Sequence, residues 1–198
     1  MLPALSPGLV TWAPSTKGEL ILVPDPLDVG RTKPYAKRVR WIHGTAAALP
    51  AVRADLVTMT GNVAQVFVTD EEWMSALAAS WVGLNPGGRL VFETRDPAKR
   101  AWEHWNREDT LALLESPGRG RVESWTEILN FDLPLVSFRH TFVFESDGTV
   151  LTSDSTLRFR RASEISASLS AAGFLVEDIR DAPDRPGKEL VFVARRPE

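Results

Sequence analysis

In the first half of the chain, short apolar runs alternate with segments whose apolar residues recur at helical spacing. Four apolar runs predict buried strands, at residues 19–23, 39–43, 56–60 and 89–93. Between the last two runs, Thr69 and Glu72 form a Thr-x-x-Glu capping box, and an apolar stripe with helical spacing follows. We expect a helix that begins at about Thr69 and ends at Gly83. This order of elements predicts an α/β fold with a doubly wound, mostly parallel sheet.

The spacing changes after the fourth run. Residues 97–115 are predicted to be helical. Three segments with period-two alternation follow, at residues 122–131, 136–145 and 150–160. Asp147-Gly148 predicts a two-residue hairpin turn between the last two of them. We expect an inserted antiparallel β segment, residues 116–160, beside the parallel sheet.

The C-terminal part predicts one more helix and a closing hairpin. The helix covers residues 163–172 and ends at Gly173. Residues 174–179 and 189–194 predict two strands, and the linker between them is too short for a crossover helix. These strands are therefore expected to be antiparallel. We interpret residues 1–198 as a single domain that starts with an irregular arm, residues 1–18.

Composition narrows the class of protein. The chain has 198 residues, of which 43% are hydrophobic and 25% charged, as in an ordinary globular protein. A formal net charge of −3 gives no electrostatic reason to expect nucleic acid or an anionic membrane as a partner. The absence of cysteine excludes disulfides and thiolate chemistry. We therefore expect a cytoplasmic protein.

Four stretches carry a resemblance to a known family. They are Trp-Ile-His-Gly at 41–44, Ala-Asp-Leu-Val-Thr-Met at 54–59, Leu-Asn-Pro-Gly-Gly-Arg-Leu-Val-Phe at 84–92 and Ser-Ala-Ala-Gly-Phe at 170–174. In this order and spacing the chain resembles class I S-adenosylmethionine-dependent methyltransferases, from about Glu19 to the C-terminus. The resemblance implies a Rossmann-like fold, S-adenosylmethionine as cofactor, and a small-molecule substrate covered by the inserted strands.

The N-terminal part departs from this family. Such enzymes have a glycine-rich loop after their first strand, and residues 1–18 contain no counterpart of it. The chain therefore resembles an N-terminally shortened (truncated) member or one rebuilt around a shorter arm, and its cofactor binding could be impaired. Because an empty place in a sheet exposes strand edges, we expect residues 9–12 to fill it, or the chain to form a homodimer.

The resemblance and the strand ends together indicate cofactor-binding residues. These are Asp25, Thr45, Ala46, Thr60, Gly61 and Asn62. In open α/β sheets, ligands bind beyond the carboxyl ends of the strands, where Gly61 and Asn62 follow the third run. Asp25 stands where the family has an acidic residue for the ribose hydroxyls, although Asp25 and Gly61 are equally consistent with ordinary turns. Thr45 replaces the acidic residue expected near the adenine.

The sequence also offers candidate residues for the substrate and for catalysis. The substrate candidates are Gln65, Arg95, Trp105 and His140, and the catalytic candidates are His140 and Glu93. In methyl transfer, alignment supplies most of the catalysis, and a base is needed only when the acceptor keeps a proton. The simpler interpretations are an ion pair between Glu93 and Arg95, and a hydrogen-bonded core position for His140. No cluster has metal-ligand spacing, so no metal is expected.

Two functions therefore remain at the level of sequence. One is an S-adenosylmethionine-dependent methyltransferase that acts on a small molecule. The alternative is a non-catalytic or repurposed protein of the same fold that binds another ligand or a protein partner.

Overall fold

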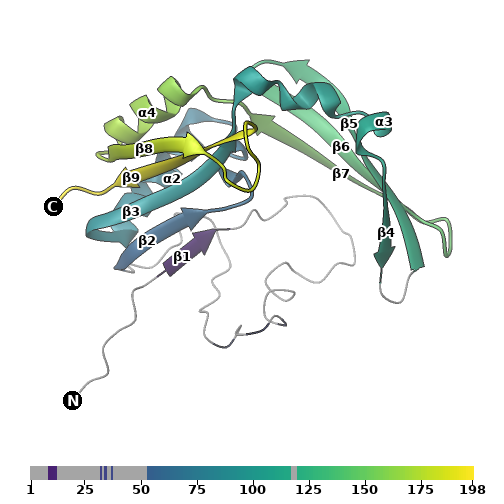
Figure 1. The fold of residues 1–198 in the computed structure, drawn as a ribbon, viewed down its shortest axis with the longest axis horizontal. Helices are drawn as coiled ribbons and strands as arrows, with labels where there is room; N and C mark the ends of the chain where they lie inside the picture. The colour runs from purple at the N-terminus through teal and green to yellow at the C-terminus, as the bar shows by residue number, and fades with distance from the viewer. Residues whose placement is uncertain (1–8, 13–31, 33, 35–36, 38–52, 117–119) are drawn as a thin grey trace.

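The computed structural model describes residues 9–12, 32, 34, 37, 53–116 and 120–198. The strands expected at residues 19–23 and 39–43 lie outside these residues. In the described part, two β-sheets lie side by side, and the second curves away from the first (Figure 1).

The first sheet has five described strands in the order β1-β2-β3-β9-β8. Their bounds are Leu9–Trp12 (β1), Ala54–Met59 (β2), Leu84–Arg95 (β3), Leu175–Asp181 (β8) and Glu189–Arg195 (β9). The first three strands are parallel, β9 is antiparallel to β3, and β8 is antiparallel to β9. The closing hairpin is confirmed. So is the expectation that residues 9–12 join the sheet, since Leu9 pairs with Leu56.

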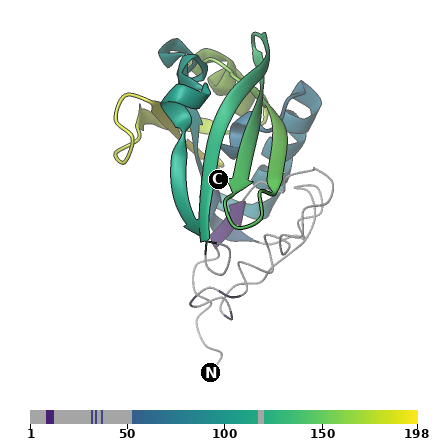
Figure 2. The same cartoon turned by 90° about the vertical axis from the view of Figure 1, so that its right-hand side faces the viewer.

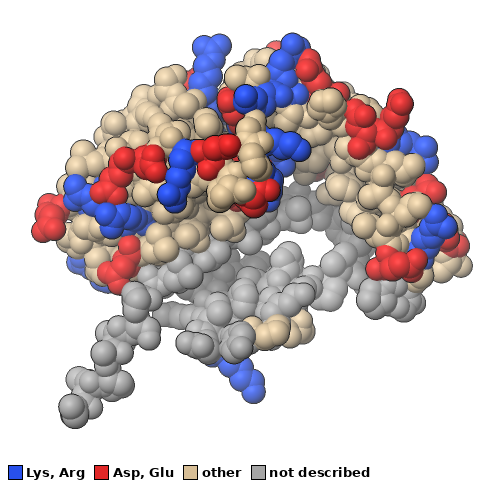
Figure 3. All heavy atoms as spheres, in the orientation of Figure 1, with Lys and Arg blue, Asp and Glu red and all other residues tan. Residues whose placement is uncertain are grey.

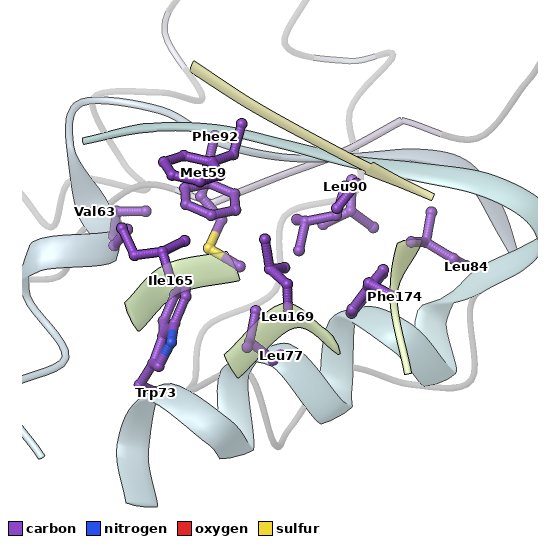
Figure 4. Packing of buried hydrophobic residues seen from close by; sticks show 14 of the residues in the cluster. Met59, Val63, Trp73, Leu77, Leu84, Leu90, Phe92, Ile165, Leu169 and Phe174 are labelled. Carbon is purple, nitrogen blue, oxygen red and sulfur yellow. The ribbon is translucent and has the colours of Figure 1, made fainter. Parts of the chain in front are cut away.

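Two helices pack on one face of this sheet and form its core. They are α2, Asp70–Gly83, and α4, Ala162–Ala171. Trp73 and Leu77 of α2 meet Ile165 and Leu169 of α4 over Phe92 of β3 (Figure 4). The α/β fold is therefore confirmed. A doubly wound sheet also has helices on its other face, and the described residues show this arrangement only in part.

The start of α2 follows from its local sequence. The Thr69 hydroxyl accepts a hydrogen bond from the Glu72 amide at 3.1 Å, and the Glu72 carboxylate accepts one from the Thr69 amide at 3.3 Å. This capping box satisfies amides that have no partner inside the helix. The predicted first turn and the end at Gly83 are both confirmed.

The second sheet is antiparallel, with four strands in chain order (Figure 2). Their bounds are Ala112–Ser116 (β4), Gly120–Asp132 (β5), Leu135–Phe144 (β6) and Val150–Arg158 (β7). The predicted two-residue turn is wrong, because β6 ends at Phe144 and β7 begins at Val150. Asp147 and Gly148 do form the bend: the Asp147 carboxylate accepts from the Thr149 amide at 2.9 Å, and Gly148 has φ 69°.

The long helix predicted at residues 97–115 is also wrong. The segment forms three short turns, Pro97–Lys99 (η4), Ala101–His104 (η5) and Arg107–Thr110 (α3), and then enters β4. Arg100 interrupts it in the left-handed region, with φ 48°. Trp102 of this segment is buried against Phe159 and Val136, which belong to a second hydrophobic cluster.

Two arginines join the second sheet to the start of α2. Arg158 donates to the Val68 carbonyl at 3.0 Å, and Arg160 donates to the Thr69 carbonyl at 3.0 Å. Arg160 is buried and its guanidinium lies 5.4 Å from the Trp73 ring. Burial lowers the pKa of Arg160 to about 10. The contact therefore places a buried charge at the boundary between the two sheets.

β8, which forms one edge of the described first sheet, contains an irregularity. Its register with β9 shifts between Val176 and Asp178, so Glu177 is the extra residue of a bulge. The Glu177 carboxylate accepts hydrogen bonds from Arg89 of β3 and Arg195 of β9, each at 2.7 Å. These two bonds fix the bulge against the neighbouring strands.

The described surface mixes both charge signs. Lys and Arg side chains alternate with Asp and Glu side chains over the face shown in Figure 3. Within the described residues, the helices are too short or too polar to cross a membrane.

Candidate functional site

The turn after β2 begins the site. Gly61 and Asn62 both have positive φ, 73° and 58°, and a 3₁₀ turn, Val63–Gln65 (η3), follows. Glycine and asparagine tolerate this left-handed conformation better than other residues do. The backbone N–H groups of Gly61 and Asn62 both donate to Oε1 of Glu93, the second at 3.3 Å. Glu93 of β3 thus holds the turn at the carboxyl ends of two parallel strands.

The side chain of Asn62 points to the closing hairpin. Its Nδ2 donates to Oε1 of Glu189 at 2.8 Å, and Arg185 donates to the same oxygen at 2.7 Å. Asn62 is only 3% exposed and Glu189 only 4%. A buried carboxylate needs such partners, because an unpaired charge in the interior is strongly unfavourable.

Gln65 connects the turn to the end of β3. Its Oε1 accepts from Nη1 of Arg95 at 3.0 Å, and the residue is only 1% exposed. The Arg95 guanidinium lies 5.6 Å from the centre of the Trp105 ring, within the range of a cation–π contact. Burial lowers the pKa of Arg95, while the nearby Glu189 carboxylate acts in the opposite direction.

Two polar atoms of this cluster are buried without a hydrogen-bond partner among the described residues. They are Oδ1 of Asn62 and Nε2 of Gln65. Leaving a buried donor or acceptor unpaired costs about 1–3 kcal/mol, so such atoms are rare unless a ligand or water satisfies them. They mark the turn as a candidate binding site for a polar ligand.

A pocket of about 390 Å³ adjoins this cluster through Trp105. Its apolar walls come from Trp102, Trp105 and Ile128, and its charged groups from Glu103, Arg107 and Glu127. Trp105 lines the pocket and also contacts Arg95, which in turn donates to Gln65. Within the described chain, no group of three or more acidic or histidine side chains is arranged to hold a metal ion.

The structure brings most of the expected site residues together. These are Thr60, Gly61, Asn62, Gln65, Glu93, Arg95 and Trp105. The expected ion pair between Glu93 and Arg95 is wrong, since Glu93 accepts from the turn and Arg95 donates to Gln65. The roles of Asp25, Thr45 and Ala46 stay predictions, because these residues lie outside the described part of the chain.

His140 lies elsewhere, on β6 of the second sheet. Its ring stacks on Phe142 at 4.6 Å and is partly exposed, and it makes no hydrogen bond to another described residue. The simpler interpretation, a hydrogen-bonded core histidine, is therefore wrong. Partial burial lowers the pKa of His140.

Glu189 and Arg185 are the site residues that sequence reasoning missed. Glu189 is the first residue of a buried strand, where an acidic side chain is unusual and could have served as a signal. Its partner Asn62 is 127 residues away in the chain, so no local pattern links the two.

Comparison with known proteins gives the fold. No protein-family model matches the chain, and no curated protein matches its sequence. Among solved structures, the CcbJ methyltransferase from Streptomyces caelestis superposes with a TM-score of 0.68, 18% identity, and coverage of 86% of this chain and 69% of that one. The chain has the class I methyltransferase fold.

Two further structures extend the comparison. An S-adenosylmethionine-dependent methyltransferase from Clostridium acetobutylicum gives a TM-score of 0.63 at 14% identity over 78% of this chain and 63% of that one. The sugar N-methyltransferase KedS8 from Streptoalloteichus gives 0.62 at 19% identity over 78% and 61%. The chain thus spans about three fifths of the length of these two methyltransferases.

Proposed function

We propose that this chain catalyses S-adenosylmethionine-dependent methyl transfer to a small molecule. The observation that carries the proposal is the pair of buried, unpaired amide atoms of Asn62 and Gln65 at the carboxyl end of β2. Ligands of open α/β sheets bind at this edge. A fold alone does not specify a function, so the polar turn is the stronger argument.

The described residues fit a polar cofactor at this turn. The backbone amides of Gly61 and Asn62 are already used by Glu93, so a ligand would contact the Asn62 side chain rather than these amides. Thr60 is exposed beside them, and Asp25, Thr45 and Ala46 complete the cofactor side in this proposal. S-adenosylmethionine, when bound, supplies a methyl group on a positively charged sulfur.

The other residues of the cluster are assigned to the acceptor side. Trp105 lines the pocket, and Arg95 and Gln65 follow it through a cation–π contact and a hydrogen bond. In this proposal these three residues orient the acceptor and exclude water. Glu93 is a positioning residue, because its carboxylate holds the turn. His140, the base expected from the sequence, lies on β6 of the second sheet and does not line the pocket, so this proposal assigns it no catalytic step.

Calorimetry with the full chain tests the proposal. We expect S-adenosylmethionine and S-adenosylhomocysteine to bind, and Asn62→Gly to weaken both at least tenfold. Glycine keeps the left-handed backbone of residue 62 while removing its side chain. The control Asn130→Ala changes an exposed side chain on β5 and should leave binding unchanged. Folded protein that binds neither compound at millimolar concentration would refute the cofactor assignment.

A turnover assay completes the test. Formation of S-adenosylhomocysteine is measured with panels of amino and hydroxyl acceptors. Binding without turnover on any acceptor, together with stabilisation by a protein partner, would favour the non-catalytic alternative.

A further inference from the structure

The pocket beside Trp105 lies between two tied walls. The segment formed by η5 and α3 supplies one wall, and Glu127 and Ile128 of β5 supply the other. The hydroxyl of Thr110, at the end of α3, accepts a hydrogen bond from the Thr126 amide of β5 at 2.8 Å. Because this bond joins α3 to β5 one residue before Glu127, the pocket is preformed, as most small-molecule sites are.

The charged side chains that line the pocket do not balance. Glu103 pairs with Arg100 at 2.6 Å, and Arg107 pairs with Glu123 at 3.3 Å. The third charged lining residue, Glu127, forms no ion pair with another described residue. The lining residues and their ionic partners therefore carry one negative charge in excess, and that charge is on Glu127.

The only hydrogen bond of the Glu127 side chain within the described chain comes from a neutral group. The indole Nε1 of Trp125 donates to Oε2 of Glu127 at 2.6 Å, which leaves Oε1 able to accept. Arg139 lies opposite Glu127 on β6, but its guanidinium makes two hydrogen bonds to Asp154, each at 2.7 Å. A cationic donor is therefore the partner that this carboxylate lacks, and such charge-assisted bonds are about twice as strong as neutral ones.

The indole rings of the pocket supply a second, independent feature. Trp102 and Trp105 form apolar walls against which a hydrocarbon group can pack. Tryptophan rings also attract positive charge. Two contacts in this part of the molecule show it: the guanidinium of Arg107 lies 4.7 Å from the Trp125 ring, and that of Arg95 lies 5.6 Å from the Trp105 ring. The walls thus suit a ligand that is both apolar and cationic.

We propose that this pocket binds a small organic ammonium ion. The ammonium group donates to the free oxygen of Glu127, and the hydrocarbon part packs on Trp102 and Trp105. An anionic ligand would meet the excess carboxylate, and a neutral ligand would leave its charge uncompensated. Identifying the molecule that carries this ammonium group as the methyl acceptor rests on the proposed function, whereas its binding by the pocket does not.

The test compares three probes that share a phenyl ring and differ in charge. Phenethylammonium, phenethyl alcohol and hydrocinnamate are titrated into the ¹⁵N-labelled full chain, and dissociation constants are read from the indole N–H signals of Trp102 and Trp105. We expect phenethylammonium to bind about tenfold more tightly than the alcohol, because its bond to the carboxylate is charge-assisted. Hydrocinnamate should bind most weakly.

Glu127→Gln is the decisive variant. The amide oxygen of glutamine still accepts from Trp125, so this contact on β5 is retained while the negative charge is lost. Phenethylammonium should bind about tenfold more weakly, and the constant for the alcohol should not change. The matched control Glu115→Gln removes the same charge from an exposed position on β4, outside the pocket, and should leave all three constants unchanged.

Four results would overturn the inference. Three are equal constants for the three probes, an unchanged ammonium constant in Glu127→Gln, and indole signals that respond to no probe. The fourth is an equal loss of affinity in Glu115→Gln, which would mean that only the net charge of the chain matters.

Experiments with S-adenosylhomocysteine separate this inference from the proposed function. Ammonium preference in a chain that does not bind S-adenosylhomocysteine would refute the proposed function but keep the ammonium site. Binding of S-adenosylhomocysteine without probe preference would refute only the ammonium site. Displacement of phenethylammonium by saturating S-adenosylhomocysteine would place the cofactor in the pocket and overturn the acceptor assignment.

Discussion

The two sheets of this chain bury their apolar side chains to very different extents. In the first sheet, Phe92 and Phe192 are fully buried and stack at 5.2 Å beneath α2 and α4. The second sheet has a small cluster and leaves many large apolar side chains 46–57% exposed. These are Leu113, Leu114, Leu129, Phe131, Leu133 and Val150. The comparison indicates that the first sheet supplies most of the stability of the chain. The second sheet depends for its stability on its contacts with the first.

The charged contacts follow the same division. Arg139 and Asp154 pair at 2.7 Å across β6 and β7, but both side chains are well exposed. Arg160, at the boundary with α2, is almost fully buried. Exposed pairs contribute little, whereas hydrogen bonds from a buried charge are harder to replace. The boundary contact is therefore expected to matter more than the cross-strand pair.

The largest effect is expected from the core of the first sheet. Phe92→Ala should lower the free energy of unfolding by about 3–5 kcal/mol, because it leaves a cavity between the sheet and both helices. Urea denaturation measures the change. Phe131→Ala, which removes a half-exposed ring of the second sheet, should cost less than about 1 kcal/mol. Equal losses would contradict the division between the sheets.

The boundary gives the next largest effect. Arg160→Met should cost about 1.5–3 kcal/mol, because it removes a buried charged donor from the Thr69 carbonyl. Hydrogen exchange should show amides of β7 opening before those of β3. The matched change Arg139→Met should leave the exchange of both strands close to wild type. Uniform loosening of both sheets would show that they unfold as one unit.

The cap of α2 should have a moderate effect. Thr69→Ala removes the side-chain acceptor of the capping box and should cost about 1 kcal/mol. Because Arg160 contacts the carbonyl of the same residue, β7 should also exchange faster. Ser163→Ala, at an exposed position in the first turn of α4, is the control and should change stability by less than half as much.

The smallest effect concerns His140. Its pKa in the folded protein is lowered by burial, so the unfolded state binds more protons between that pKa and 6.5. Stability is therefore present above pH 6.5 and decreases as the pH falls through this window. His140→Gln should remove this decrease. An NMR titration in which the His140 ring titrates at or above pH 6.5 would contradict the prediction.

Local signals explain why some elements could be predicted. The capping box of α2 and the glycine after α4 set the ends of helices that lie within a few residues of them in the chain. The closing hairpin follows from the short length of the linker between its strands. The segment 97–115 could not be predicted in this way. Trp102 and Leu114 occur at helical spacing, but one is buried in the second cluster and the other is exposed on β4.

The same distinction holds at the site. Gly61, Asn62, Gln65 and Arg95 were predicted because the ends of parallel strands are recognisable in sequence. The contacts that orient them were not. Glu189 and Arg185 come from the closing hairpin, and only the folded sheet brings that hairpin to the turn after β2.

The bulge in β8 has a consequence for self-association. A regular outer strand offers a row of unused amides on which another chain can continue the sheet. Here the extra residue disturbs that row, and its carboxylate is clamped inward by Arg89 and Arg195. Three charged residues of β8, Asp178, Arg180 and Asp181, follow along the same edge. Edge-to-edge association of copies through β8 is therefore disfavoured, which protects the molecule from fibrillar growth at that edge.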